Sequence, residues 1–378
     1  MTTEPIYLDH NATTPVAPEV ADAMEPFLRD HFGNPSSSHA LGRRARAAVD
    51  EARAEVARLI GATPDEIVFT SGGSEADNMA VFGVVAARAP GRRGVVTSAV
   101  EHPAVLEPCR VLERQGTPLT VLGVDPAGRL DLAAAADAIG PGTALVSVMH
   151  ANNEVGTIQP IAELAELCRD RGAWLHTDAA QSVGKVPVDV ETLGVDLLTV
   201  AAHKLYGPKG IGALYVRRGH EIPRLIHGAG HERGRRAGTE NVLAIVGLGA
   251  AARLARAELD DRVAHARAMR DRLRARLGER FGDLVVHGDP ERGLPNTLSV
   301  ALPGVRAADL LAALGDQVAA SPGAACHADG IAVSSVLTAM DVPLDVATGT
   351  VRLSVGRTTT GTDVDRAAAV IAAAVEAG

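Results

Sequence analysis

Three lysines, at positions 185, 204 and 209, supply all the side-chain amines among the 37 Lys and Arg residues of this sequence. A buried amine loses its proton more easily than an exposed one, and its neutral form can attack a carbonyl carbon to form a Schiff base. Lys204 follows an apolar segment and has small neighbours, which favours burial. Lys185 and Lys209 lie in turns rich in Gly and Pro, and we expect both to point to solvent. Lys204 is therefore the favoured nucleophile, although position alone does not decide among the three.

Asp178 ends the apolar segment 173–177. A carboxylate at the end of a buried strand is costly unless a cation pairs with it. The protonated ring nitrogen of pyridoxal phosphate is one such cation, because this cofactor needs that proton to draw electrons from its substrate. An arginine side chain is the other candidate partner. The sequence leaves both open.

Two segments could bind an anion. Residues 71–75 lie between a predicted strand and a predicted helix, where Gly73 and Ser74 would present backbone N–H groups. The same residues equally suit a helix that is merely capped by Ser74, with Asp77 three residues later. Residues 231–239 form a basic, glycine-rich loop that suits a phosphate, a carboxylate of a partner or a solvated turn. The glycine patterns of dinucleotide and nucleoside triphosphate sites do not occur in the sequence.

Cys326 differs from the other two cysteines in its surroundings. It lies in a glycine-rich stretch, whereas Cys109 and Cys168 lie in helical patterns, where cysteine serves as a small packing residue. Exposure and nearby cationic side chains would favour its thiolate. His327 follows directly, but adjacent side chains seldom face one another, so a Cys–His hydrolase dyad has weak support.

These residues must be positioned by an alternation of strands and helices between residue 66 and about residue 216. Strands are predicted at 66–70, 94–98, 119–122, 144–149, 173–177, 197–200 and 211–216. Helical patterns such as 74–87 and 161–171 lie between them. The alternation predicts an α/β fold with a mostly parallel sheet covered on both faces. Ligands bind beyond the carboxyl ends of such strands, which is where the candidate residues occur.

A long amphipathic helix is predicted from about residue 253 to residue 281, with Leu254, Leu273 and Leu277 on its apolar face. We expect it to lead into a second domain, because a chain of 378 residues exceeds the size at which single cores usually stop growing. That domain would continue through strands at 297–302 and 351–355.

The composition excludes several classes of protein. Apolar residues make up 46% and charged residues 22%, as in ordinary globular proteins. The formal net charge of −9 argues against direct nucleic-acid binding. Three irregularly spaced cysteines suit a reducing compartment rather than a disulfide framework. The sequence has neither a signal-peptide pattern nor an apolar run of bilayer length, so we expect a cytoplasmic protein with no membrane partner.

Taken in order, these motifs resemble one family nearly end to end. The shared segments are YLDHNATTP at 7–15, GNPS at 33–36, EH at 101–102, HANNEVG at 150–156, DAAQSVGK at 178–185, HKLYGPKG at 203–210, GHER at 230–233, the segment around Cys326, and RLSVGR at 352–357. The chain resembles class V aminotransferases, specifically the cysteine desulfurases that supply iron–sulfur assembly and thiolation, and also selenocysteine lyases.

The resemblance implies pyridoxal 5'-phosphate as cofactor and a role for each matching residue. The residues that match the family's cofactor contacts are Lys204 as the Schiff-base lysine, His102 stacked on the ring, Asp178 at the ring nitrogen, Asn153 and Gln181 near the ring hydroxyl, and Gly73, Ser74 and His203 at the phosphate, with Thr239 contributed by the neighbouring subunit. Arg352, assisted by Asn34, would bind the substrate carboxylate, a task suited to guanidinium. Cys326 would receive the sulfur as a persulfide. No metal is expected.

The implied fold is the type I fold of pyridoxal-phosphate-dependent transferases, with a large mostly parallel sheet domain and a smaller α/β domain. The large domain would span 15–252, and the small domain would combine 1–14 with 253–378 and carry the catalytic cysteine. A homodimer is implied, with L-cysteine as substrate and a sulfur-acceptor protein as partner. The acceptor could serve iron–sulfur assembly, tRNA thiolation or DNA phosphorothioation, and the sequence does not choose among them.

Two departures from the family pattern affect these expectations. Ala201 stands where desulfurases commonly have a phosphate-binding serine, which removes one hydrogen bond. The Ala-Ala-Cys-His run at 324–327 is similar to selenocysteine lyases, so L-selenocysteine remains an alternative substrate. A pyridoxal-phosphate transaminase would not need Cys326, and an inactive sulfur-relay scaffold would not need Lys204, His102 and Asp178.

Overall fold

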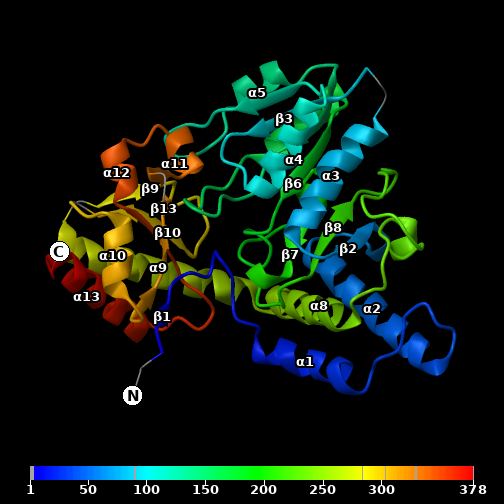
Figure 1. The fold of residues 1–378 in the computed structure, drawn as a ribbon, viewed down its shortest axis with the longest axis horizontal. Coiled ribbons are helices and arrows are strands. Elements are labelled where there is room, and N and C mark those ends of the chain that lie inside the picture. The colour runs from blue at the N-terminus through cyan, green and yellow to red at the C-terminus, as the bar shows by residue number, and fades with distance from the viewer. Residues whose placement is uncertain (1–3, 89–90, 283, 303, 328–329, 378) are drawn as a thin grey trace.

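The computed structural model describes residues 4–88, 91–282, 284–302, 304–327 and 330–377, and the side chains of 324–327, 330–332 and 377 fall outside the description. The chain forms a larger part built on a wide sheet and a smaller part built around a narrower one, with two long helices, α8 and α9, connecting them (Figure 1).

The wide sheet has seven strands in the order β2-β8-β7-β6-β5-β3-β4. Their bounds are β2 Ile67–Thr70, β3 Gly94–Ser98, β4 Leu119–Leu122, β5 Thr143–Ser147, β6 Trp174–Asp178, β7 Leu197–Ala201 and β8 Gly212–Val216. Strands β3 to β7 are parallel to one another, and β8 runs antiparallel to both of its neighbours. The expected mostly parallel sheet is confirmed, and every predicted strand lies within a few residues of an observed one.

Both faces of this sheet are covered. Strands β5, β7 and β8 are buried along their whole length, which is typical of strands packed between two layers of helices. Because side chains alternate along a strand, Leu145 joins the cluster under α3 (Gly73–Ala87) and α4 (Pro103–Arg114), while Val146 joins the cluster on the opposite face. The helices of that opposite cluster include α2 Ala40–Leu59, α5 Leu132–Ala138, α6 Ile161–Arg171, α7 Val190–Leu193 and α8 Val242–Ala257.

Helix α2 packs closely on α8, and α1 (Pro18–Arg29) lies beside them. The approach requires glycine, because a Cβ on Gly249 would lie 2.5 Å from the Ala52 Cα. Three short 3-10 turns follow strands or loops, at η1 Pro64–Glu66, η2 Ala202–Lys204 and η3 Glu232–Gly234.

The smaller part contains a four-stranded antiparallel sheet in the order β12-β15-β10-β9. Its strands are β9 Val285–His287, β10 Thr297–Ala301, β12 Ser321–Pro322 and β15 Thr350–Ser354, and the helices α9 Leu259–Phe281, α10 Ala307–Leu314 and α13 Gly361–Ala377 pack with it. Strand β1 (Ile6–Tyr7) pairs in parallel with β11 (Val318–Ala319), so the N-terminal residues Ile6 and Leu8 join the core of the C-terminal third. The domain boundaries at 14/15 and 252/253 stay a prediction.

Two further short strands, β13 (Ala324–His327) and β14 (Gly330–Val333), pair antiparallel, and Cys326 lies opposite Ile331 in their backbone register. Short helices α11 (Ser335–Ala339) and α12 (Leu344–Thr348) follow. A small apolar cluster packs α11 residues Val336 and Leu337 against Val100 and Val155 of the larger part.

The predicted single helix over 253–281 is wrong in one respect. The chain leaves helical geometry at Glu258, so that α8 and α9 are separate helices. Each helix has its own partner, because Ala251 and Ala255 of α8 pack on the large core and Leu273 and Leu277 of α9 pack on the small one. Along the described ranges, none of the helices combines the length and the apolar character that crossing a bilayer requires.

Candidate active site

A cavity of about 480 Å³ opens at the carboxyl ends of the central strands. Nine of the twelve predicted site residues line it: Gly73, Ser74, His102, Asn153, Asp178, Gln181, His203, Lys204 and Arg352. They come from the ends of β2, β3, β5, β6 and β7 and from β15 of the smaller part. The topology of a parallel sheet therefore gathers residues that are 279 positions apart (352 − 73) around one space.

Lys204 ends the 3-10 turn η2 that follows β7. Its Nζ donates hydrogen bonds to the carbonyl oxygens of Asn11 at 2.6 Å and Ala12 at 2.8 Å. Burial, assisted by the positive charge of Arg352, lowers the pKa of Lys204 to about 8. The amine can therefore lose its proton near neutral pH, as a nucleophile must.

Lys185 does not point to solvent, so that prediction was wrong. Its Nζ donates to Gln181 Oε1 at 2.7 Å and to Asn11 Oδ1 at 3.1 Å. Burial, together with the charges of Lys204 and Arg352, holds the pKa of Lys185 well below its usual range. The Lys185 side chain points inward because these two uncharged oxygens accept its hydrogen bonds there. Lys209 is exposed, as expected.

Asp178 ends β6 and is 8% exposed. Its Oδ1 accepts a hydrogen bond from the Ala180 N–H at 2.9 Å. Burial raises the pKa of this carboxyl. No arginine pairs with Asp178 within the described part of the chain, so the alternative partner considered from the sequence is not present there. A cation placed in the cavity would offset the cost of its burial.

His102 caps the start of α4. Its Nδ1 accepts the Ala104 backbone N–H at 3.1 Å, which leaves Nε2 as the nitrogen that carries the proton of a neutral ring. Burial lowers the pKa of His102, so the neutral form predominates. A neutral imidazole at the cavity wall can stack on an aromatic ring without adding charge.

The first turn of α3 and His203 both line the cavity. Helix α3 begins at Gly73 after Gly72, whose φ of +151° suits glycine. Ser74 therefore lies inside the first turn, and its predicted capping role is wrong, because the cap position belongs to Gly72. His203 is oriented by contact of its Nδ1 with Thr13 Oγ1 at 3.2 Å. Free N–H groups at a helix start together with a histidine suit a phosphate group.

Arg352 forms the opposite wall from strand β15. Its Nη2 donates to Asp9 Oδ1 at 2.7 Å and to Ser321 Oγ at 2.9 Å, and its Nη1 donates to the Asn153 carbonyl at 3.0 Å. Its Nε is buried and has no hydrogen-bond partner among the described atoms. An unpartnered guanidinium N–H beside a cavity suits a carboxylate ligand.

Asn11 is a contact that the sequence reasoning missed. Besides accepting from Lys204 and Lys185, it donates from Nδ2 to the Asn153 carbonyl at 3.1 Å and to Thr297 Oγ1 at 2.8 Å. Asn11 therefore connects both parts of the chain at the floor of the cavity. Asn11 lies in the segment 7–15 that carries the family resemblance, and this was the signal available in the sequence.

Asp77 is a second missed residue. It lines the cavity, is buried, and lies 3.6 Å (Oδ1) from His176 Nε2. Burial and the nearby Asp178 charge raise its pKa well above the usual range. Its spacing of four from Gly73 places both on one face of α3, which the sequence would have revealed.

Two predicted site residues lie outside the lining of this cavity, and a third cannot be placed relative to it. Asn34 is exposed, and its Oδ1 accepts from the Ser36 N–H at 2.9 Å. Thr239 is exposed on the basic loop. The side chain of Cys326 lies outside the described residues, although its backbone is placed in β13. Their roles stay predictions.

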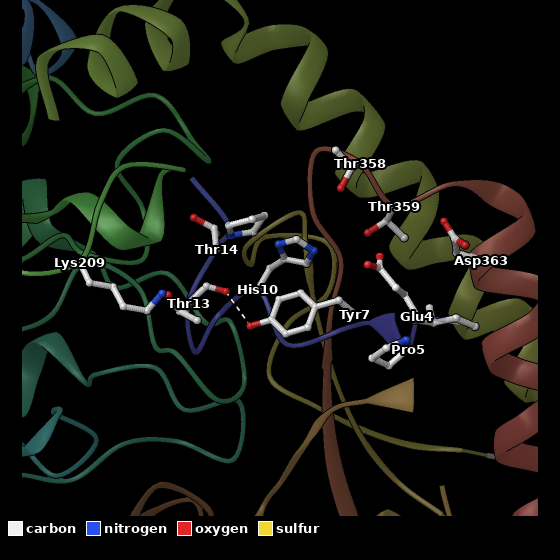
Figure 2. Close-up of a pocket in the computed structure, with 12 residues that line it drawn as sticks. Glu4, Pro5, Tyr7, His10, Thr13, Thr14, Lys209, Thr358, Thr359 and Asp363 are labelled. Carbon is white, nitrogen blue, oxygen red and sulfur yellow. Dashed lines mark hydrogen bonds between the residues drawn. The ribbon is translucent and has the colours of Figure 1, made fainter. Parts of the chain in front are cut away.

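A second cavity, of about 550 Å³, is lined by other residues of the N-terminal segment, among them Tyr7 and Thr13 (Figure 2). Asn11 and Ala12 line the first cavity, whereas His10, Thr13 and Thr14 line the second. The Tyr7 hydroxyl donates to the Thr13 carbonyl at 2.9 Å within this segment (Figure 2). None of the predicted site residues lines the second cavity.

The first cavity fits pyridoxal phosphate. It offers an amine with a lowered pKa, a buried carboxylate that forms no ion pair within the described residues, and a helix start beside His203. These groups match an aldehyde, a ring nitrogen and a phosphate in turn. The space beside Gly73 is not filled by the protein. Even a Cβ added to Gly73 would lie 3.5 Å from the Ala201 Cβ, which is an ordinary contact.

The chain matches a protein family, named relatives and solved structures over almost its full length. The pattern of the aminotransferase class V family matches residues 6–367. A cysteine desulfurase of Gluconacetobacter diazotrophicus is 49% identical over 364 residues, covering 96% of this chain and 91% of that protein. The solved structure of a NifS-like protein has a TM-score of 0.93 at 36% identity and covers 100% of both chains. The structure of SspA in complex with cysteine has a TM-score of 0.81 at 34% identity, covering 95% of this chain and 100% of that one.

Proposed function

The chain belongs to the class V aminotransferase family, and we propose that it is a pyridoxal-phosphate-dependent cysteine desulfurase that converts L-cysteine to L-alanine and receives the sulfur on Cys326. The observation that carries this proposal is the shared cavity. It brings the Lys204 amine, whose pKa is lowered to about 8, together with Asp178 and the unpartnered Nε of Arg352. The names of the similar cysteine desulfurases point to the same activity.

The cofactor would be held by residues of the large sheet. Lys204 would bind its aldehyde carbon covalently, Asp178 its ring nitrogen, and His102 the face of its ring. The groups assigned to the ring hydroxyl and the phosphate are Asn153, Gln181, Gly73, Ser74 and His203, with Thr239 from a neighbouring subunit. Ala201 lines the cavity with a methyl group only, so the phosphate would depend on the other groups named for it.

Bound pyridoxal phosphate supplies an electron sink that weakens the bonds around the substrate Cα. Arg352, with Asn34, holds the substrate carboxylate and so fixes its Cα beside Lys204. Lys204, released when the substrate amine replaces it on the aldehyde carbon, would take the Cα proton, which its lowered pKa allows near neutral pH. With the cofactor bound, Asp178 would pair as a carboxylate with the protonated ring nitrogen, and His102 would cover the ring and exclude water.

Sulfur transfer then depends on the Cys326 thiolate. It attacks the substrate sulfur, the new S–S bond forms, and the Cβ–S bond breaks. The electron pair of that bond stays on the substrate carbon, which is protonated to give alanine. The net reaction takes L-cysteine and the thiol to L-alanine and a Cys326 persulfide. A sulfur-acceptor protein would regenerate the thiol, in iron–sulfur assembly, tRNA thiolation or DNA phosphorothioation.

The proposal includes a homodimer in the cytoplasm. Thr239 is exposed and outside the cavity of its own chain, which supports its use by a second copy. An enzyme that forms a persulfide also needs a compartment where thiols stay reduced.

The test is alanine formation from L-cysteine with a thiol reductant present, for the wild type and for Cys326→Ser and Lys204→Ala. We expect alanine from the wild type and a loss of roughly a hundredfold or more in both variants, because each removes a group that forms a covalent bond. Full activity in Cys326→Ser would overturn the persulfide route. Turnover of L-selenocysteine but not L-cysteine would move the assignment to selenocysteine lyase.

A further inference from the structure

Strands β13 and β14, called here the Cys326 strand pair, are attached at both ends to groups that surround Arg352. The first attachment is in β12. Ser321 lies opposite Arg352 in the β12–β15 register. Its Oγ donates to Asp9 Oδ1 at 2.9 Å and accepts from Arg352 Nη2 at 2.9 Å. The residue that contacts the Arg352 guanidinium group therefore lies only three positions before the start of β13 at Ala324.

The second attachment is Ser334, which follows β14. Its N–H donates to the Gly323 carbonyl at 3.1 Å and closes the base of the strand pair. Its hydroxyl donates to Glu154 Oε2 at 2.5 Å and accepts from the Val336 N–H at 3.0 Å. Ser334 therefore caps α11 and at the same time ties the strand pair to the larger part of the molecule.

Glu154 is adjacent to the substrate clamp in sequence and in space. The preceding residue, Asn153, accepts Arg352 Nη1 at its carbonyl at 3.0 Å. The Glu154 N–H donates to Asn152 Oδ1 at 2.8 Å, which fixes its backbone. Burial raises the pKa of the Glu154 carboxyl, whereas the Ser334 hydroxyl and the Arg352 charge act in the opposite direction. The mechanism described above gives this carboxyl no role.

We propose that Glu154 is a positioning residue for sulfur transfer, whose hydrogen bond with Ser334 fixes the base of the Cys326 strand pair beside the carboxylate clamp at Arg352. This inference rests on the proposed function of Cys326. The Glu154 carboxylate would thereby hold Cys326 at a suitable distance from the substrate bound at Arg352.

The consequence is selective, because the two halves of the reaction need different groups. Removal of the Cα proton needs Lys204 and Arg352 but not the thiol. Attack on the substrate sulfur needs the thiol at a defined distance, and small misplacements are costly for such steps. A loosened strand pair should therefore slow persulfide formation while proton removal continues.

The experiment uses the cofactor-loaded enzyme with Glu154→Ala, which leaves the Ser334 cap of α11 in place. Glu154→Gln keeps an acceptor oxygen and serves as the conservative variant. Glu166→Ala removes an exposed carboxylate from α6 and is the matched control. Proton removal is followed by exchange of the Cα hydrogen of L-alanine in deuterium oxide. Persulfide formation on Cys326 is followed by mass spectrometry in a single turnover with L-cysteine.

For Glu154→Ala we expect persulfide formation to slow by about tenfold to a hundredfold, with alanine exchange within about twofold of wild type. Glu154→Gln should recover most of the loss, and Glu166→Ala should match wild type in both assays. Equal losses in both assays would show that Glu154 acts through Arg352 or the fold, and an unchanged persulfide rate would show that it does not position the thiol. Wild-type enzyme that exchanges alanine but forms no Cys326 persulfide would instead overturn the proposed function.

Discussion

At the scale of single residues, the chemistry depends on an amine that is uncharged near neutral pH. Lys204 sits among carbonyl acceptors, with Arg352 as a nearby cation and Asp178 as a partly compensating anion. Burial is the largest of these influences, and it favours the neutral form. The protein alone therefore lowers the pKa of Lys204, with no ligand needed.

This environment predicts the pH dependence of cofactor capture by the apoenzyme. Only the neutral amine attacks the aldehyde, and the pKa of Lys204 is lowered to about 8. The rate of pyridoxal phosphate incorporation should therefore rise with pH and level off above about 8, far below the range of an ordinary lysine. Stopped-flow absorbance between pH 6 and pH 10 measures this rate. A midpoint near the ordinary lysine value would contradict the buried environment described for Lys204.

The burial expected for Lys204 is found, whereas the exposure expected for Lys185 is not. Both lysines lie within a few residues of glycine or alanine, and they differ in which acceptors meet the amine after folding. Gln181 lies four residues before Lys185, but Asn11 comes from a distant segment, and no local pattern indicates that both meet this amine. Residues whose role depends on such convergence, Asn11 among them, could not be identified from spacing alone.

At the scale of elements, the loop that carries Thr239 is held by a buried ion pair. Arg53 of α2 donates from Nη1 and Nη2 to the Glu232 carboxylate at 2.7 Å each, and both side chains are almost fully buried. Glu232 also accepts the Phe69 N–H at 2.9 Å. Glu232 and Arg233 have positive φ angles, so the loop conformation is held by these contacts rather than by local preference.

Arg53→Met should therefore destabilise the protein strongly, because it leaves a buried carboxylate unpaired. We expect a loss of about 3–5 kcal/mol in the free energy of unfolding, measured by urea titration of the holoenzyme. Arg218→Met is the control, since the Arg218–Asp65 pair is exposed and should be worth about 0–1 kcal/mol. Similar losses in the two variants would mean that the Arg53 pair does not hold the loop.

The elements also show where sequence patterns suffice. Strands such as 94–98 and 119–122 were predicted to the residue, because β-branched runs bounded by turns determine them locally. The break at Glu258 was missed, because α8 and α9 share a continuous helical pattern and differ only in the core on which each packs.

At the scale of the whole molecule, the sheet topology explains why one chain gathers most of the site and leaves part of it open. The carboxyl ends of parallel strands converge on the cavity, and β15 adds Arg352 from the smaller part. Thr239 stays on the surface of the same chain. The family resemblance supplied this expectation, and no spacing in the sequence could have done so.

A homodimer that shares its sites predicts complementation between two defective chains. Lys204→Ala and Thr239→Val should each lower activity when present alone, the second by about tenfold through loss of a hydrogen bond to a charged group. In mixed dimers one site would carry both defects and the other neither, so co-expression should restore part of the activity. Purified mixed dimers, separated by different affinity tags, provide the measurement. If no activity returns, Thr239 serves its own chain or no cofactor at all.

The central claim is that Cys326 alone receives the sulfur. Cys109 and Cys168 are buried, and burial raises the pKa of each thiol to about 12, so neither should react. The direct measurement is a single turnover of the holoenzyme with L-cysteine, followed by alkylation, digestion and mass spectrometry of the three cysteine peptides. We predict one added sulfur on the peptide that contains Cys326, in step with one alanine per site. Alanine formed with no added sulfur on that peptide, or with sulfur on Cys109 or Cys168, would contradict the account.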